Sequence, residues 1–411
     1  VAVYASTSSF SGAVRAYGGN PWQQGPYGGA GTVVIGSGLV VDNNNHFGAD
    51  TPLPAGVHAF TQVMSKRKAV LSLPVQASLD YSELQVREGG KLVNAGTLAG
   101  SPASKVLLDT GGQIEHNAGT FTAGELTTAS TFISNAALTA EALTVSAGGT
   151  FYLNTSLSIP SVSVLSGGVL THSAGDPDFN LTVTGNMEVL SGGRVSADGK
   201  GYPGGQGPGR GADAGTTEAN SSGAGGGYGG RGGDFGGVWG GIAYGSLVEP
   251  IDFGSGGGHA YRAYPAGGAG GGALKITVSG ELRVDGAITA NGLATTAVHP
   301  AYWSAGGGAG SGGSVLIRAG SIAGSGSIAA DGGSKMVSGG GGGGGRIAVY
   351  ASTAAFSGAV RAYGGNPWGQ GQYGGAGTVV VGQDLALDNN NHVGAETTLP
   401  PGVYNFSVVV S

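Results

Sequence analysis

Cysteine is absent from the 411 residues, so the chain can form neither a disulfide framework nor a thiolate metal site. Charged residues make up only 10% of the chain, and its formal net charge is −6. Lysine and arginine are scattered apart from Lys66, Arg67 and Lys68, so there is no basic stripe for nucleic acid. No apolar run approaches the roughly 20 residues of a membrane-spanning helix. A signal peptide and an initiator methionine are also missing, which suggests an excised or processed piece.

Glycine, in contrast, is abundant: the chain has 89 glycines and 16 prolines, a share that is typical of low-complexity chains. Hydrophobic residues nevertheless make up 40% of the sequence. A disordered chain usually has the opposite balance, because it lacks the apolar surface that offsets the entropy cost of ordering. We therefore expect glycine to be concentrated in particular segments, with a packed core elsewhere.

A long repeat organises the sequence, because residues 347–411 repeat residues 1–65 with a constant offset of 346. Both copies contain FSGAVRAYGGNPW, YGGAGTVV and DNNNH in the same order. Self-similarity at this scale indicates one full period, residues 66–411, preceded by a partial repeat, residues 1–65, that is the end of another period. We expect either a segment of a longer tandem array or a subunit whose two ends resemble each other.

A finer period of about 20 residues runs inside the long one. Residues 274–292, 315–332 and 347–364 each contain short stretches of alternating apolar and polar residues, separated by Gly or Ser turns. Such alternation indicates strands with one buried face, and helix signals are nearly absent. The pattern predicts an all-β fold, a single-stranded right-handed parallel β-helix (a solenoid) with long Gly-rich loop insertions on one face. A two-sheet β-sandwich is the alternative.

The long Gly-rich stretches follow the same point of each rung, after Gly199, Gly292, Gly332 and Gly364. Insertions at a fixed place in a solenoid emerge on one face of the stack. Two interpretations of the glycine runs stay open. They are either flexible linkers, or extended polyproline-II-like segments whose missing side chains let backbones approach closely. The predicted inserts are residues 200–272, 293–312, 333–345 and 365–376.

Large aromatic residues gather in these inserts, which include every tryptophan of the chain. One interpretation is structural: the rings pack on the flank of the β-helix and hold the Gly-rich loops down. The other is functional, because aromatic residues are enriched at recognition surfaces for sugars or for a neighbouring copy. The candidates for self-association or glycan contact are Trp22, Trp239, Trp303, Trp368, Tyr228, Tyr244 and Tyr261.

Metal and catalytic signals are sparse. The DNNNH segments are rich in oxygen ligands, and calcium candidates there and nearby are Asp42, Asp50, Asp388 and Glu396. The structural alternative is a corner at which Asx side chains cap turn amides. No HExxH motif occurs, and carboxylates are spread over different rungs rather than paired. We therefore predict no catalytic residue, no resident metal and no enzyme, and calcium is the one cofactor left open.

The phrases SGGRVSADGKGYPGG, GGALKITVSGELRVDGAITANG and GGGGGGGRIAVYAS resemble pieces of giant repetitive Gly-rich bacterial surface proteins of the adhesin or filament type. The resemblance covers about residues 180–411 and 1–65 and transfers no site residues. It implies an extracellular or cell-surface β-helix, of prokaryotic origin, that builds a fibre, sheath or adhesin by association with copies of itself end to end and laterally. The alternative is a β-helix that binds or cleaves surface carbohydrate through the insert aromatics.

Overall fold

The computed structural model describes residues 1–4, 14–20, 27–177, 179–215, 221–295, 305–334, 338–367 and 371–411. These residues form two compact units. Unit 1 comprises Val1–Thr171 with Thr182–Asn186, and unit 2 comprises His172–Leu181 with Met187–Ser411. Strand β18 (Asn180–Val183) contributes residues to both units. Among the described residues, no helix has the length and apolar character that crossing a membrane requires.

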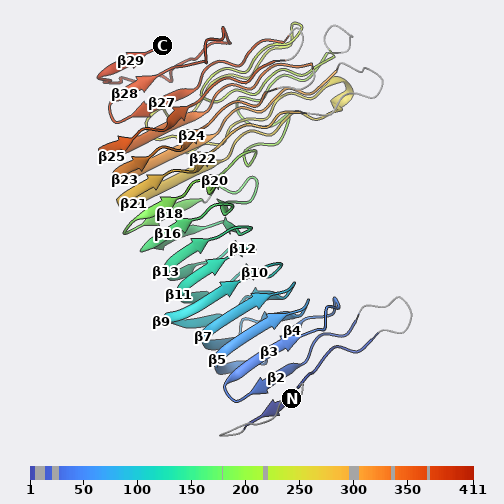
Figure 1. Cartoon of the computed structure of the whole chain (residues 1–411). Helices are drawn as coiled ribbons and strands as arrows, with labels where there is room; N and C mark the ends of the chain where they lie inside the picture. The colour runs from blue at the N-terminus through green and yellow to red at the C-terminus, as the bar shows by residue number, and fades with distance from the viewer. Residues whose placement is uncertain are drawn as a thin grey trace. The chain divides into compact units, whose positions relative to one another are not determined.

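Unit 1 is a stack of rungs in which a long strand alternates along the chain with a short one (Figure 1). Each strand pairs in parallel with the equivalent strand of the next rung, so the rungs build two sheets. The first sheet contains β5 (Gly56–Lys66), β7 (Ala77–Arg87), β9 (Thr97–Leu108), β11 (Thr120–Thr128), β13 (Leu138–Val145) and β16 (Ser161–Val164), and β15 (Ser156–Ile159) precedes β16. The second contains β4 (Thr51–Pro52), β6 (Val70–Leu73), β8 (Lys91–Asn94), β10 (Gln113–His116), β12 (Thr131–Ser134), β14 (Thr150–Leu153) and β17 (Val169–Thr171).

The core of unit 1 follows from the alternation in the sequence. In the short strands β8, β10, β12 and β14 every second residue is buried, and equivalent residues of successive rungs stack on one another. Phe132 and Phe151 are register partners, and their ring centroids lie 4.8 Å apart. Polar side chains also occur inside: Asn94 Nδ2 lies 3.0 Å from Nδ1 of fully buried His116, whose Nε2 lies 2.8 Å from the Ala137 carbonyl.

Unit 2 continues the same rung pattern with longer interruptions. One sheet contains β19 (Met187–Val189), β21 (Ala273–Val284), β23 (Ser314–Gly324), β25 (Arg346–Phe356) and β27 (Thr378–Val381), which pair in parallel. The second contains β20 (Arg194–Ser196), β22 (Ala287–Thr289), β24 (Ser327–Ala329) and β26 (Ala359–Arg361), also parallel. In both units a strand pairs with the equivalent strand one rung away, so the predicted parallel β-helix is confirmed and the β-sandwich is excluded.

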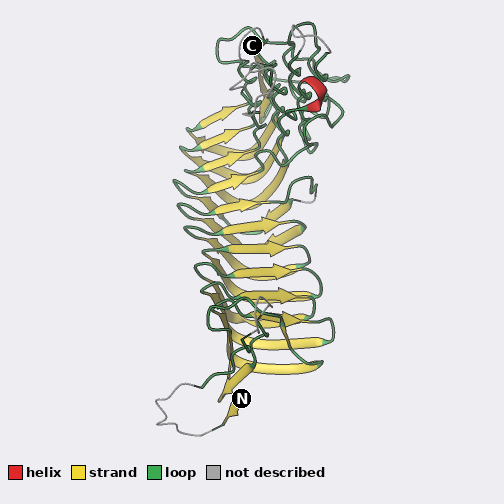
Figure 2. Ribbon diagram, turned by 90° about the vertical axis from the view of Figure 1, so that its right-hand side faces the viewer, coloured by secondary structure: helices red, strands yellow, loops and turns green. Residues whose placement is uncertain are grey.

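The Gly-rich inserts of unit 2 leave the rungs at one corner, as predicted. Each starts after a short strand and returns to the next long strand, so the inserts occupy residues 197–272, 290–313, 330–345 and 362–377. In Figure 2 the described parts of these segments gather as loops beside the strands, and the helix drawn among them is the 3-10 turn η2 (Tyr261–Ala263). The lengths of the inserts, rather than the rungs themselves, therefore distinguish unit 2 from unit 1.

The described parts of the duplicated sequences share a hairpin and the strands beside it. In the first copy, β1 (Ala2–Val3) pairs with β2 (Thr32–Ile35), which forms an antiparallel hairpin with β3 (Gly38–Asp42). In the second copy, β27 forms the equivalent hairpin with β28 (Asp384–Ala386), which pairs with β29 (Val408–Val410) as β3 pairs with β5. The hairpins are an addition to the purely parallel fold that we expected. Gly36 and Gly382 make them possible, because their φ angles of 58° and 59° allow a tight reversal.

Candidate functional site

The inserts of unit 2 pack together into a single body, which we call the glycine block. It consists of the described parts of residues 201–272, together with 305–313, 338–345 and 371–377. Most of these residues are buried although, apart from η2, they belong to no strand or helix. Their backbone groups are paired across the block: for example, Gly226 N donates to Ala309 O at 2.8 Å and Gly343 N to Gly226 O at 2.8 Å. The extended, ordered alternative for the glycine runs is therefore the one that the structure adopts.

The hydrogen bonds of the glycine block repeat every three residues. Within residues 308–313, amides 308 and 311 donate to the segment 255–258, and amides 309 and 312 donate to the segment 340–343. Amides 310 and 313 donate to a third neighbour, residues 290–293. Three successive amides thus point toward three different neighbours, and the pattern then repeats. This is the symmetry of a polyproline-II helix, which has three residues per turn and no internal hydrogen bonds. The segment 308–313 is therefore hydrogen-bonded to three neighbours at once.

Such packing requires glycine because the backbones approach too closely for a side chain. A Cβ atom added to Gly308 would lie 1.7 Å from the Ala224 carbonyl oxygen. At Gly342 it would lie 1.9 Å from the Gly310 oxygen, and at Gly374 1.9 Å from the Gly342 oxygen. Real contacts of this kind are longer than about 3.3 Å even for weak Cα–H···O hydrogen bonds. The composition of the inserts is therefore a consequence of their packing.

Two candidate aromatics face inward and join the glycine block to the β-helix. Tyr228 has no exposed surface, and its hydroxyl lies 2.6 Å from Ser314 Oγ on β23. The Tyr244 hydroxyl lies 2.8 Å from Ser255 Oγ, and its carbonyl accepts a hydrogen bond from Nε of Arg346 at 2.8 Å. Burial raises the pKa of both tyrosines. Tyr228 thus cannot contact a glycan or another chain, and the packing interpretation applies to both residues.

Arg346 is the largest fully buried side chain of the described residues, and it lies at this junction. Its Nη1 donates to Thr378 Oγ1 at 3.1 Å, and its guanidinium carbon lies 5.6 Å from the centre of the Tyr228 ring. No carboxylate among the described residues forms an ion pair with it. Burial therefore lowers the pKa of the guanidinium group, and neutral acceptors together with the tyrosine ring compensate the charge.

Trp239 differs from these tyrosines, because 68% of it is exposed on the outer side of the block. It borders a small pocket of about 190 Å³ that Asp234 and Gln372 also line. Tyr261 lies in the 3-10 turn, where the guanidinium carbon of Arg262 is 5.2 Å from its ring centre. The remaining three candidates, Trp22, Trp303 and Trp368, lie outside the described residues.

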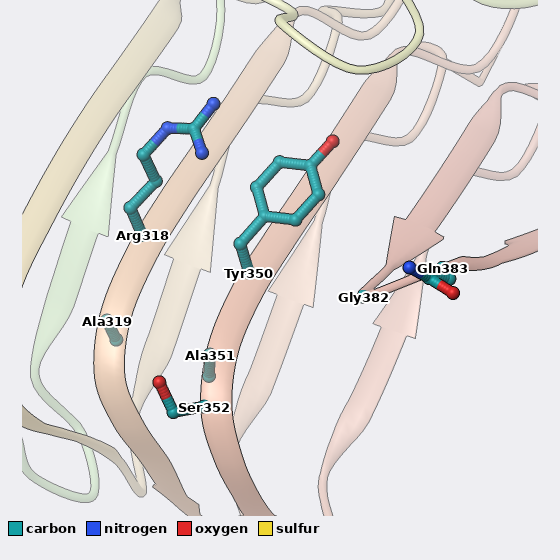
Figure 3. Close-up of a pocket in the computed structure, with 7 residues that line it drawn as sticks. All are labelled: Arg318, Ala319, Tyr350, Ala351, Ser352, Gly382 and Gln383. Carbon is teal, nitrogen blue, oxygen red and sulfur yellow. The ribbon is translucent and has the colours of Figure 1, made fainter.

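A second, larger depression lies on the sheet itself. It is a shallow open groove of about 470 Å³, lined by β23, β25 and the turn between β27 and β28 (Figure 3). Arg318 and Tyr350 are register partners, and the guanidinium carbon lies 4.8 Å from the tyrosine ring centre. Arg318 also pairs with Glu249, and the Tyr350 hydroxyl donates to the Val248 carbonyl at 2.9 Å, so a loop of the glycine block is fastened to the sheet. Sequence reasoning missed both residues, although each follows the apolar run of its strand at the same rung position.

The DNNNH segments adopt the corner structure. Asn43 Oδ1 accepts from Gly18 N at 2.9 Å, and its equivalent Asn389 Oδ1 accepts from Gly364 N at 2.8 Å. Asp42 accepts hydrogen bonds from Nε of Arg67 at 2.9 and 3.0 Å, which raises the pKa of that guanidinium. Asp388 accepts from Asn390 N at 2.8 Å, as expected of an Asx turn.

The calcium candidates do not form a site in this arrangement. The carboxylate of Asp42 is bound to a guanidinium group, and those of Asp50 and Glu396 are exposed. Within the described ranges, no group of three or more His, Asp or Glu side chains is placed to hold a metal ion. The Asx-corner alternative therefore explains the conserved spacing of the two DNNNH copies better than metal binding does.

No protein-family model, no curated protein and no solved structure matches this chain.

Proposed function

We propose that the chain is a structural β-helix segment, the building block of an extracellular fibre, sheath or giant adhesin of a prokaryote. In this function, its partners are copies of itself. The observation that carries the proposal is that the described parts of residues 1–65 and 347–411 form the same hairpin, with the same two parallel strand pairings beside it and in the same register. A module that recurs in structure as well as in sequence is the property that a polymer of stacked rungs needs.

The two copies differ in what covers them, and the difference indicates how one repeat follows another. In the first copy, β7 pairs with β5, and Val63 of β5 is 1% exposed. In the second copy, the equivalent residue is Val409 of β29, which is 61% exposed. We infer that a strand equivalent to β7 covers β29, and that it comes either from a following repeat or from another copy of the chain. Uncovered strand edges favour such pairing.

The glycine block supports a mechanical role. The segment 308–313 is hydrogen-bonded to three neighbours, two of which belong to other inserts, and Arg346 and Tyr228 fasten the block to the rungs. Bending one rung against the next therefore requires breaking backbone hydrogen bonds in the block as well as in the sheets. We propose that the block stiffens the rod along its length and offers its outer face for lateral association.

Hydrogen exchange measured by mass spectrometry tests end-to-end stacking. The amides of residues 402–411 are compared in the chain as it stands and in a chain extended after Ser411 by a second copy of residues 66–171. We expect residues 402–411 of the extended chain to become as protected as their equivalents 56–65. Protection that grows with the concentration of the 411-residue chain, with rods in negative-stain micrographs, indicates stacking of separate copies instead. If neither sample gains protection, the proposal is wrong.

A further inference from the structure

Trp239 directly follows a tight hairpin at the surface of the glycine block. Phe235 N donates to Val238 O at 2.9 Å, and Val238 N donates back to Phe235 O at 2.7 Å. Gly236 and Gly237 form the turn with φ angles of 53° and 83°, which only glycine adopts without strain. Phe235 and Val238 are buried at 8% and 7% exposure, so they anchor the hairpin from below. The backbone that carries Trp239 is therefore fixed by hydrogen bonds and by buried neighbours.

The surroundings of Trp239 are polar and ordered. The guanidinium carbon of Arg231 lies 5.6 Å from the indole centre, and its Nη2 donates to Asp234 Oδ1 at 2.7 Å. Gly240 N donates to the same oxygen at 2.7 Å. Gln372 N donates to the Asp234 carbonyl at 2.9 Å, which places the exposed Gln372 beside the carboxylate. One aromatic ring, one carboxylate and one amide thus converge on the pocket of about 190 Å³.

We propose that this pocket, which we call the Trp239 subsite, binds a single pyranose ring of a glycan. The C–H face of a sugar ring is apolar and slightly positive, so it stacks on the electron-rich face of indole. Its hydroxyl groups are hydrogen-bond donors and acceptors, which the Asp234 carboxylate and the Gln372 amide match. A mostly preformed pocket with a few convergent polar groups is typical of small-ligand sites. This proposal is independent of the structural role of the rungs.

A sugar suits the Trp239 subsite better than a second copy of the chain does. A stable protein interface buries about 800 Å² on each partner and has a core depleted of charge. Here the tryptophan stands next to the Arg231–Asp234 ion pair, whose side chains are 25% and 17% exposed. The concave shape and small volume accommodate one ring rather than a flat protein surface. The subsite has no carboxylate pair arranged for glycoside cleavage, so the inference is binding alone.

A glycan array probed with the intact 411-residue chain tests the inference, followed by titration of the glycan that binds most tightly. We expect selective binding, and at least tenfold lower affinity for Trp239→Ala, while Trp239→Phe retains part of the affinity because a ring remains. Ile242→Ala is the matched control, since Ile242 is 63% exposed in the same insert but does not line the pocket. It should bind as the unaltered chain does.

Three results overturn the inference. The first is an array with no selective binding by the unaltered chain. The second is binding that Trp239→Ala leaves unchanged or that Ile242→Ala reduces equally. The third is a loss of concentration-dependent self-association in Trp239→Ala, measured by sedimentation, without any effect on glycan binding. That result assigns the tryptophan to a contact between copies. Trp239 is exposed, so its variants should unfold at the same temperature as the unaltered chain, and calorimetry checks that they do.

Discussion

A pair of equivalent glycines tests whether backbone packing explains the composition of the inserts. Residues 15–22 and 361–368 have the same sequence, RAYGGNPW, in the two copies of the repeat. A Cβ atom added to Gly19 meets nothing within 4 Å, whereas one added to its equivalent Gly365 lies 2.0 Å from the Gly333 carbonyl oxygen. Gly365 N also donates to Gly342 O at 2.7 Å. We therefore expect Gly365→Ala to destabilise the protein and Gly19→Ala to leave it intact.

The expected magnitude follows from the contact that must be relieved. Forcing a methyl group into a filled space costs about 1 to 3 kcal/mol. A displaced backbone hydrogen bond adds about 1 kcal/mol. Alanine offsets about 0.5 kcal/mol of this, because it restricts the unfolded chain more than glycine does. Gly365→Ala should thus lower the free energy of unfolding by about 2 to 3 kcal/mol, while Gly19→Ala changes it by less than about 1 kcal/mol in the stabilising direction.

Differential scanning calorimetry measures both variants against the unaltered chain. For a folding unit of about 200 residues, the loss at Gly365 corresponds to a melting temperature lower by roughly 4 to 12 °C. Hydrogen exchange of residues 340–345 locates the effect, because these amides belong to the packed neighbours of Gly365. Equal shifts in the two variants, or an unchanged melting temperature in Gly365→Ala, would show that glycine is not required by close backbone packing.

Three further predictions address buried polar groups. Arg346→Ala should lower the free energy of unfolding, measured in urea, by about 3 kcal/mol or more, since it leaves a cavity and unpaired acceptors. Arg361→Ala, which removes a half-exposed side chain, should lower it by less than about 1 kcal/mol. Burial lowers the pKa of His116, so the unfolded chain binds a proton before the folded chain does as pH falls below about 6.5. The free energy of unfolding should therefore drop by up to about 1.4 kcal/mol per pH unit until the pKa of the folded state is passed. A drop of the same size in His116→Gln would exclude this cause. Asp42→Asn should lower the free energy of unfolding by about 1 to 3 kcal/mol, because it removes the ion pair with Arg67. The equivalent change Asp388→Asn should have a smaller effect. A melting temperature of the unaltered chain that falls when a chelator is added would contradict the Asx-corner interpretation.

The parallel β-helix could be predicted from the sequence because its signal is local. Alternating apolar residues bury one face of each strand, and turns that return about every 20 residues leave only a solenoid. The sequence also predicted the corner at which the inserts emerge, because each insert follows the short strand of its rung. The antiparallel hairpins could not be predicted in this way. Their turns at Gly36 and Gly382 look like any other turn of the chain.

The candidate site was harder to predict, because the type of a side chain does not indicate whether that side chain lies on the inner or the outer side of an insert. Tyr228, Tyr244 and Trp239 come from one insert and were equivalent in the sequence. The structure places the Tyr228 side chain against β23, holds that of Tyr244 within the block and leaves that of Trp239 exposed. Arg318 and Tyr350 are register partners on neighbouring strands, and their contact depends on which rungs are adjacent.

The repeated RAYGGNPW segment separates what the sequence determined by itself from what the tertiary structure decided. The sequence determined the local structure, since both copies place Asn43 or Asn389 against the first glycine of the pair and follow it with the same hairpin. Only the tertiary structure decided that Gly19 faces open space and Gly365 faces a carbonyl. The physical reason is that strands and corners follow from apolar alternation and Asx residues present in each rung, whereas the glycine block joins segments of four inserts. These segments have few side chains to specify their neighbours, so their pairing depends on where the rungs place them.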